Sequence, residues 1–373
     1  MAEHVLVTGG MGFIGRRVVA ELQSRGARVR VLDSMNEQVH GEASNPTDVA
    51  AEADIELQIG DIRDADAVSA ALEGIDAVVH LAAEVGVGQS MYEIERYTAV
   101  NELGTAVLFQ QMLKRPIRRI VTASSMSIYG EGLYRASSGA LVEDARRVSA
   151  VDGGVQWDPV DASGGVLQPI PTPEWKRPTL SSVYALNKYA QEQMTLIVPP
   201  AYGVESVALR LFNVFGPGQA LSNPYTGVLA IFAARLLNGR APMIFEDGEQ
   251  QRDFVHVDDV ARAFADALDK PGLSGEVMNI GSGSPISIGD LARRFAAVMG
   301  REDLAPDITR KVRTGDIRHC FADIAKAEAL LGYRPRQNLD DGLAKLADWV
   351  RTQKADDRVD AASSELAARG LVT

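Results

Sequence analysis

A tyrosine and a lysine, Tyr184 and Lys188, lie four residues apart in a segment that we expect to be helical. Residues four apart share one face of a helix, so the phenol hydroxyl and the ammonium group can reach one site. A free tyrosine has a pKa of about 10 and is a poor base at neutral pH, but a nearby positive charge favours its phenolate. The pair therefore indicates a proton acceptor, although the same spacing also arises by chance on amphipathic helices.

A glycine-rich turn near the start of the chain predicts a nucleotide cofactor for this chemistry. Three glycines recur at intervals of three residues between an expected strand and an expected helix. Glycine at such positions permits a tight turn, the approach of a pyrophosphate to backbone N–H groups and close packing of the helix on the strand. The helix N-terminus then faces the phosphates. The predicted contacts are Gly9, Gly12, Phe13, Ile14 and Gly15.

Two aspartates follow the next expected strands. Asp33 ends the second strand, where its carboxylate can accept hydrogen bonds from the adenosine ribose hydroxyls. The same charge would repel a 2′-phosphate, so NAD is favoured over NADP. Asp61, followed by Ile62, comes after the third strand and could meet the adenine amino group. A turn or capping aspartate is the alternative interpretation of both carboxylates.

Composition excludes several classes of protein. The 373 residues carry a net charge of −12, which disfavours nucleic-acid binding because that affinity depends on concentrated positive charge. We find no apolar run near the roughly 20 residues needed to span a bilayer. The strand-like start at Val5–Val7 comes too early for a leader segment to precede it, so we expect a cytoplasmic protein. A single cysteine, Cys320, can form neither an intrachain disulfide nor a cysteine-based zinc site, and no metal is predicted.

The alternation of short apolar runs with helical periodicity predicts an α/β fold with a Rossmann-type, doubly wound parallel sheet. We expect a smaller mixed α/β domain after it. The expected strands of the sheet are Val5–Val7, Arg28–Leu32, Ile55–Gln58, Ala77–His80, Arg119–Thr122 and Ser206–Leu211, and the expected helices between the first five are Ile14–Gln23, Ala65–Leu72 and Thr105–Lys114. Later in the chain we expect helices at Val228–Leu237, Ile288–Val298 and Leu339–Thr352 and strands at Met243–Phe245 and Glu276–Ile280.

The predicted domains follow from these patterns. Residues 1–210 form the NAD-binding domain, with residues of about 250–280 returning to it, and residues 211–350 form the substrate-binding domain. Residues 131–180 are rich in Gly, Pro, Ser and Asp and predict a long loop, which we interpret as a lid over the cleft. Residues 351–373 predict a peripheral helix or a frayed tail.

The ordered motifs resemble the extended short-chain dehydrogenase/reductases, in the group of nucleotide-sugar epimerases and dehydratases. The similarity runs from about residue 4 to about residue 350. Besides the motifs above it rests on His80-Leu81-Ala82-Ala83, Asn101 with Gly104-Thr105, Ala123-Ser124-Ser125-Met126-Ser127, Arg210-Leu211-Phe212-Asn213, Arg252-Asp253-Phe254-Val255-His256 and Arg313-Thr314-Gly315-Asp316.

The resemblance implies roles for individual residues. Tyr184 would be the base, Lys188 would orient the nicotinamide ribose and lower the pKa of Tyr184, and Ser125 would hydrogen-bond the reacting oxygen. Asn213 would hold the substrate diphosphate, and arginines would neutralise it despite the acidic total, because local charge decides binding. The remaining implied contacts are Leu81, Ala82, Ala83 and Asn101 with the cofactor, and Ser127, Phe245, Arg252, Arg313, Asp316 and Cys320 with the substrate. Phe245 as a core residue, the arginines in surface ion pairs and Cys320 as a plain buried thiol are the alternatives.

The resemblance also implies the reaction. Family members take a hydride from C4 of a nucleotide sugar to NAD, giving a 4-keto sugar and bound NADH, and then diverge. Related dehydratases carry Asp and Glu after the active-site Thr, whereas Met126 and Ser127 stand here and cannot do carboxylate chemistry. A 4-epimerase, which is an isomerase, needs only room for the keto sugar to turn over. A dehydratase, decarboxylase or ketoreductase on the same scaffold stays an alternative, and a non-catalytic dinucleotide sensor is a third.

Further motifs are similar to the bacterial branch that includes dTDP-L-rhamnose 4-epimerases. They include Val85-Gly86-Val87-Gly88-Gln89-Ser90-Met91-Tyr92 and the inserted Trp157-Asp158-Pro159. Some members of that branch carry cysteines in the insertion, and none stands here, so the sugar and its nucleotide stay open. The resemblance further implies a homodimer, formed by helices near Thr98–Lys114 and Ser181–Ile197.

Overall fold

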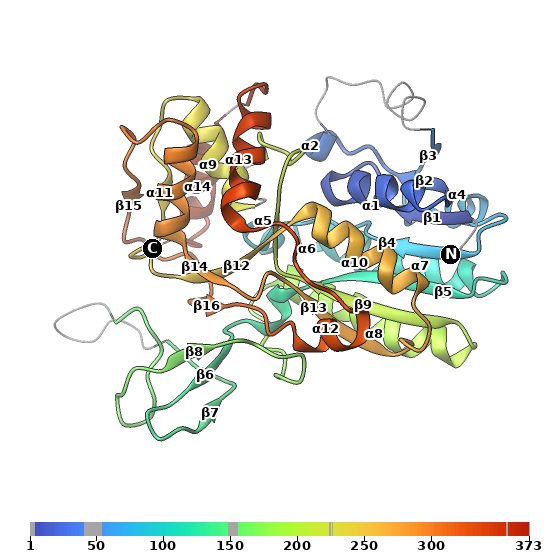
Figure 1. The fold of residues 1–373 in the computed structure, drawn as a ribbon, viewed down its shortest axis with the longest axis horizontal. Helices are drawn as coiled ribbons and strands as arrows, with labels where there is room; N and C mark the ends of the chain where they lie inside the picture. Colours follow the sequence, from blue (N-terminus) through green and yellow to red (C-terminus); the bar gives the residue numbers. More distant parts are fainter. Residues whose placement is uncertain are drawn as a thin grey trace.

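The computed structural model describes residues 4–40, 54–147, 156–223, 225, 227–355 and 357–372. Its centre is a seven-stranded parallel sheet in the order β13-β9-β5-β4-β1-β2-β3 (Figure 1). The fold class predicted from the sequence is confirmed. The strands of this sheet are β1 (His4–Thr8), β2 (Arg28–Asp33), β3 (Glu56–Ile59), β4 (Ala77–His80), β5 (Arg119–Ser125), β9 (Glu205–Leu211) and β13 (Glu276–Ile280).

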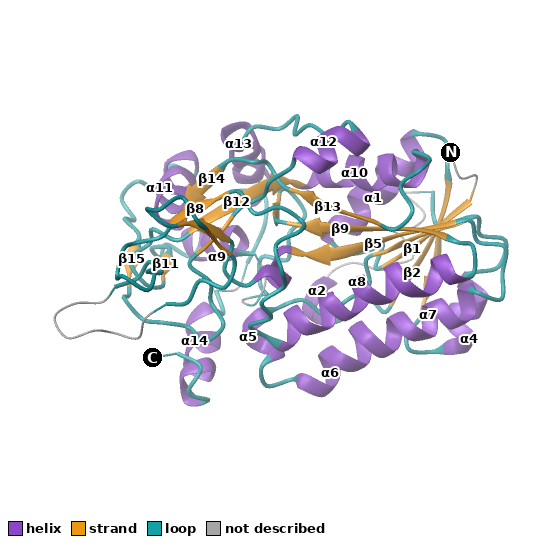
Figure 2. Ribbon diagram, turned by 90° about the horizontal axis from the view of Figure 1, so that it is seen from below, coloured by secondary structure: helices purple, strands orange, loops and turns teal. Residues whose placement is uncertain are grey.

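Helices cover both faces of this sheet (Figure 2). Because side chains alternate along a strand, Val5 and Val7 pack into one apolar cluster, while Leu6 packs into another on the opposite face. The first cluster includes residues of α1 and α10, and the second includes residues of α4 and α7. The helices before and around the sheet are α1 (Phe13–Ser24), α2 (Glu37–His40), α4 (Ala65–Ala71), α5 (Val87–Ser90), α6 (Ile94–Thr98), η1 (Ala99–Leu103), α7 (Gly104–Met112), η2 (Met126–Tyr129), α8 (Val183–Ala201), α10 (Val257–Asp269) and α12 (Ala325–Leu331).

A third apolar cluster surrounds a smaller sheet on the left of Figure 1. In that sheet β10 pairs in parallel with β12, and β12 also pairs with β14 and β16. A separate short pair joins β11 to β15. The elements here are β10 (Asn213–Phe215), α9 (Val228–Leu237), β11 (Met243–Ile244), β12 (Gln251–His256), β14 (Pro285–Ser287), α11 (Ile288–Val298), β15 (Asp307–Ile308), β16 (His319–Cys320) and α13 (Leu339–Val350).

The inserted segment is more regular than the loop that its composition predicts. It contains a three-stranded antiparallel sheet of β6 (Leu133–Arg135), β7 (Leu141–Val142) and β8 (Gln168–Ile170). The central strand β6 pairs with β8, more than 30 residues further along the chain. Strands of two or three residues are too short to show an alternating pattern, which is why the sequence pattern missed this sheet.

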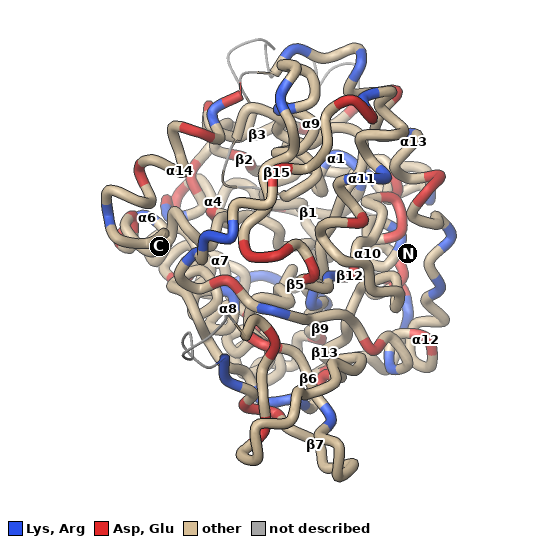
Figure 3. Tube along the Cα trace, turned by 90° about the vertical axis from the view of Figure 1, so that its left-hand side faces the viewer, with Lys and Arg blue, Asp and Glu red and all other residues tan. Residues whose placement is uncertain are grey.

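The last described residues form a helix, α14 (Val359–Ala368), one of the two outcomes expected for the tail. None of the helices in the described ranges is both long and apolar enough to cross a membrane. Lys and Arg are interspersed with Asp and Glu on the face drawn in Figure 3.

Candidate active site

A cavity of about 860 Å³ lies beyond the carboxyl ends of the parallel strands. It opens between β1 and β4, where the chain changes the direction in which it adds strands to the sheet. Open α/β sheets bind ligands at this switch point, because the loops that follow the two strands diverge there. The cavity brings together Gly9, Gly12, Phe13, Ile14, Gly15, Asp33, Asp61, Ile62, Leu81, Ala82, Ala83, Ser125, Ser127, Tyr184, Lys188, Asn213, Phe245, Arg252, Arg313 and Asp316.

The glycine turn is built for close approach. Gly9 has φ +72°, and a Cβ there would lie 2.9 Å from the backbone nitrogen of Ala82. A Cβ at Gly15 would lie 2.2 Å from the carbonyl oxygen of Gly9. Helix α1 starts after Gly12 and no side chain caps its N-terminus, so its first N–H groups stay open to a ligand. This cradle fits the pyrophosphate of a dinucleotide.

Asp33 points into the adenosine end of the cavity and is already hydrogen-bonded. It accepts hydrogen bonds from the backbone N–H groups of Met11 and Met35, each at 3.0 Å, and lies 3.2 Å from His40 Nε2. Burial opposes its ionisation, but the hydrogen bonds from His40 and Met35 outweigh that and hold the pKa of Asp33 below its usual value. The carboxylate is therefore charged at neutral pH. Asp61 also lines the cavity and forms an ion pair with Arg63 at 2.6 Å.

Two predicted contacts do not line the cavity. Asn101 is fully buried, where its side-chain amide holds the backbone N–H and carbonyl of Glu84 at 2.7 and 3.1 Å. It therefore shapes the loop after β4 instead of touching a ligand. Cys320 is buried in a small apolar cluster, with its thiol 3.9 Å from Thr172 Oγ1. Cys320 is thus a buried thiol in the protein alone, and its contact with the substrate stays a prediction.

The cavity holds Tyr184, Ser125 and Lys188 where α8 passes the end of β5. Ser182 caps the N-terminus of α8, which fixes the turn of helix that carries Tyr184. Burial raises the pKa of Tyr184, and a hydrogen bond with Ser125 opposes that rise. Ser127 Oγ donates to Ser125 Oγ at 2.9 Å, so the two hydroxyls form a chain towards the phenol.

The electrostatics of Lys188 differ from the prediction. Its ammonium group donates to Gln191 Oε1 at 2.8 Å, and burial lowers its pKa to about 7. Burial raises the pKa of Tyr184 in the protein alone, so the net direction is opposite to the lowering expected from Lys188. The physical reason is that burial of both side chains disfavours both of their charged forms.

A buried polar network behind Lys188 escaped the sequence reasoning. Gln191 Nε2 donates to Thr105 Oγ1 at 2.8 Å, and His80 connects Thr105 to Thr8 at 2.9 and 2.7 Å. Burial lowers the pKa of His80 to about 3, so this histidine is neutral. The sequence motifs include His80 and Thr105, and Gln191 lies one turn beyond Lys188, but no pattern shows that the three meet, because they come from distant strands and helices.

The opposite end of the cavity carries two arginines. Arg252 donates to the carbonyl oxygens of Gln251 and Arg318, each at 2.9 Å, and of Ile317 at 2.5 Å. These carbonyl groups orient the guanidinium but leave its positive charge in place, whereas a carboxylate would neutralise it. Arg313 instead pairs with Asp316 at 3.0 and 2.8 Å.

The aromatic and amide groups predicted for the substrate lie beside these arginines. The Arg313 guanidinium lies 5.2 Å from the centre of the Phe245 ring. The side-chain N–H₂ of Asn213 donates a hydrogen bond to the carbonyl of Asp253 at 2.9 Å. Its side-chain oxygen remains available to accept a hydrogen bond from a ligand. Phe245 and Asn213 both line the cavity, so a ligand can reach them.

The role of the insertion as a cover stays a prediction. None of its described residues, 131–147 and 156–180, lines the cavity. Ion pairs join it to the rest of the protein, among them Arg318 with Asp158 at 2.6 Å and Arg147 with Glu246. Helix α14 lines the cavity instead, through Val359, Ala362, Ser363 and Leu366.

This combination of a switch-point cavity, a glycine cradle and a serine–tyrosine–lysine group defines a dinucleotide-dependent oxidoreductase-type site. The comparisons with known proteins agree. A family model described as the NAD dependent epimerase/dehydratase family matches residues 5–145 and 163–281. The chain belongs to this family, which confirms both the resemblance and NAD as the cofactor.

Individual relatives cover nearly the whole chain. The dTDP-L-rhamnose 4-epimerase of Burkholderia thailandensis is 36% identical, covering 93% of this chain and 95% of that one. The UDP-glucose 4-epimerase of Thermotoga maritima, solved with UDP-glucose, has a TM-score of 0.75 at 29% identity and covers 93% and 98%. The UDP-glucose 4-epimerase of Thermus thermophilus, solved with NAD, has a TM-score of 0.72 at 28% identity and covers 94% and 99%.

Proposed function

We propose that this protein is an NAD-dependent nucleotide-sugar 4-epimerase, an isomerase that inverts C4 of a sugar bound through a nucleoside diphosphate. The observation that carries the proposal is the cavity itself, which joins a tyrosine–serine pair to two arginines. Such a cavity can hold a dinucleotide in the glycine cradle and an anionic nucleotide sugar beside it. The sequences of the named relatives support the same reaction class.

The side chains divide the chemical work between them. Ser125 lies within hydrogen-bonding reach of Tyr184 and holds the sugar 4-hydroxyl against the phenol oxygen. Tyr184 takes the hydroxyl proton and later returns it, which is general acid–base catalysis by one group. NAD⁺ held in the glycine cradle would supply the hydride acceptor for C4, and inversion would require the sugar to turn over before the hydride returns. Because burial keeps Tyr184 protonated in the protein alone, ionisation of the phenol must accompany ligand binding.

Lys188 orients the cofactor ribose in this proposal. Its hydrogen bond to Gln191 holds the ammonium group at a fixed place on α8. With a pKa of about 7 it can carry its charge when an anionic neighbour forms and lose it when none is present. Arg252 and Arg313 neutralise the substrate diphosphate, and Phe245 stacks on the nucleotide base.

The residues after Ser125 favour epimerisation over dehydration. Elimination of water from the sugar needs an acid and a base beside C5 and C6. Met126 and Ser127 line the cavity at this place and neither is a carboxylic acid. A dehydratase or another reaction on the same scaffold is therefore the weaker proposal.

The experiment is incubation of the purified protein with UDP-, dTDP-, GDP- and ADP-sugars without added reductant. We expect NMR to show inversion at C4 of one of these sugars. Tyr184→Phe should keep its NAD and lose nearly all turnover, whereas Tyr202→Phe, at a site 68% exposed, should behave as wild type. Formation of a 4-keto-6-deoxy sugar, or full activity of Tyr184→Phe, would contradict the proposal.

We also propose a homodimer, formed by α6, η1, α7 and α8. Four large apolar side chains on these helices are about half exposed or more, namely Ile94, Leu103, Leu186 and Ile197. Burying them against a second copy would remove apolar surface from water. Light scattering should give twice the chain mass, and Leu186→Glu should halve it.

A cytoplasmic location stays a prediction.

A further inference from the structure

Helix α14 carries an apolar face that belongs to the cavity. Val359, Ala362 and Leu366 are buried at helical spacing, and all three line the cavity together with Ser363. The match to the family model ends at residue 281, so family membership assigns nothing to this helix. We call residues 357–372 the C-terminal strap.

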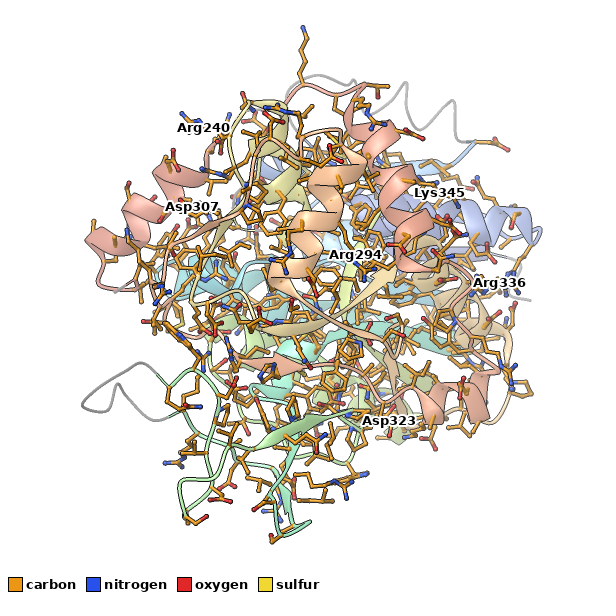
Figure 4. The ribbon with its side chains drawn as sticks, turned by 60° about the vertical axis from the view of Figure 1, so that its left-hand side comes forward. Arg240, Arg294, Asp307, Asp323, Arg336 and Lys345 are labelled. Atoms are coloured by element: carbon orange, nitrogen blue, oxygen red, sulfur yellow. The ribbon has the colours of Figure 1, made fainter. Side chains whose placement is uncertain are left out.

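Ion pairs fix the first turn of the strap to the end of α9. Arg235, only 8% exposed, lies 2.9 Å from Asp360, and Arg240 lies 2.6 Å from the same carboxylate. Asp357 adds a contact with Arg240 at 3.3 Å. Arg240 is labelled in Figure 4. Two arginines sharing two carboxylates make a network, which holds geometry better than a single exposed pair.

The end of α14 rests on the loop that follows β4. Leu366 packs against Gly88, because a Cβ built on Gly88 would lie 3.4 Å from the Cδ2 atom of Leu366. The Arg369 guanidinium lies 4.2 Å from the centre of the Tyr92 ring, and Tyr92 donates a hydrogen bond to Tyr225 at 2.9 Å. In Figure 2, α14 lies below α9 and to the left of α5. Its contacts with Arg235 of α9 and Gly88 of α5 make it a bridge between two helices that line the cavity.

The chain then turns back to the segment that carries Arg313. The N–H of Thr314 donates to the carbonyl of Leu371 at 2.8 Å, and Arg313 forms an antiparallel bridge with Val372. Leu371 and Val372 do not line the cavity. Any effect of these two residues on a ligand must therefore pass through the segment that they hold.

We propose that the C-terminal strap is part of the substrate site and positions Arg313 for the diphosphate of the nucleotide sugar. This inference rests on the proposed function. In the protein alone Arg313 pairs with Asp316 and covers Phe245, so binding must redirect its guanidinium. Anchoring the backbone at Arg313 and Thr314 limits that movement to the side chain, which reduces the entropy lost on binding.

The test uses the full chain with its NAD bound and a shortened chain that ends at Gly370. The shortened chain keeps α14, and neither of the removed residues that the structure describes, Leu371 and Val372, lines the cavity. We expect the Kd for UDP, dTDP, GDP or ADP, whichever the wild type binds, to rise about 10-fold by calorimetry. The NAD content and the midpoint of thermal unfolding should stay unchanged. Asp360→Arg, which breaks the first anchor, should act in the same direction, and Asp348→Arg on α13, whose carboxylate is exposed, is the matched control.

Combination with Arg313→Met separates positioning from a general structural role. If the strap acts through Arg313, shortening the chain should not weaken binding further in the Arg313→Met background. Equal losses in both backgrounds, an unchanged Kd in the shortened chain, or a wild type that binds none of the diphosphates would overturn the inference. A wild type that binds a diphosphate but inverts no sugar would instead refute the proposed function alone, and the comparison of Kd values would still decide the role of the strap.

Discussion

Replacing Lys188 by methionine should stabilise the cofactor-free protein at pH 6. Burial lowers the pKa of Lys188 from 10.5 to about 7, so its charged form is disfavoured in the native state relative to the unfolded chain. A difference of about 3.5 between these values corresponds to a penalty of about 5 kcal/mol at pH values below 7. Methionine has a similar length and no charge, so it removes this penalty.

The replacement also has a cost. Lys188 donates to Gln191 Oε1 at 2.8 Å, and leaving that buried acceptor unpaired costs about 1–3 kcal/mol. The net stabilisation at pH 6 is therefore about 2–4 kcal/mol.

The dependence on pH is the sharper test. The penalty on wild type is complete below pH 7 and disappears as the pH rises towards the unfolded value of 10.5, because the native state has by then released the proton. At pH 9 about 2 kcal/mol of penalty remains. The advantage of Lys188→Met should therefore shrink by about 2–3 kcal/mol between pH 6 and pH 9.

Urea unfolding of cofactor-free protein, followed by tryptophan fluorescence and circular dichroism, measures this difference. Lys345→Met is the matched control, because Lys345 also donates to a glutamine Oε1 at 2.8 Å but is exposed on α13. A free-energy difference that does not change with pH, or a Lys188→Met protein less stable than wild type at pH 6, would refute the assignment of a desolvated lysine. Activity should be lost in Lys188→Met at every pH.

Three further predictions concern other buried groups. Glu192→Ala should lower the free energy of unfolding by about 3–5 kcal/mol, because it leaves the buried Arg210 guanidinium unpaired, and an exposed Asp348→Ala control should change it by less than about 1 kcal/mol. Burial raises the pKa of Cys320 to about 12, so iodoacetamide at pH 8 should label the thiol only in urea, and rapid labelling of native protein would contradict the buried position. Asp33→Ala should weaken NAD binding about 10-fold by calorimetry, and unchanged affinity would count against the ribose contact.

Local patterns were sufficient for the glycine turn and for several helices and strands in both parts of the fold. The turn from Gly9 to Gly15 needs no distant partner to be recognised, because the steric limits on a Cβ act within a few residues. Helices α9 and α11 and strands β4 and β13 begin and end where their periodicity predicts. In each case the signal and the structure lie in the same short segment.

Long-range contacts decide what a sequence pattern leaves open. The described residues of 131–180, which the sequence predicts as a cover, do not line the cavity, and ion pairs such as Arg318 with Asp158 join them to the rest of the fold. Two residues predicted to contact ligands, Asn101 and Cys320, are buried and do not line the cavity in the protein alone. A sequence pattern shows that a residue is polar or small, but only packing against distant segments decides which way it points.

The fold class, the dinucleotide cradle and the spacing of Tyr184 and Lys188 could all be read from the amino-acid order, because each depends on geometry within one turn, strand or helix. The protonation of those two side chains and the position of the C-terminal strap became visible only in the folded chain. The pKa values depend on burial by elements remote in the chain, and the strap depends on ion pairs between residues more than 100 positions apart. Neither burial nor pairing over such distances leaves a periodic trace in the sequence.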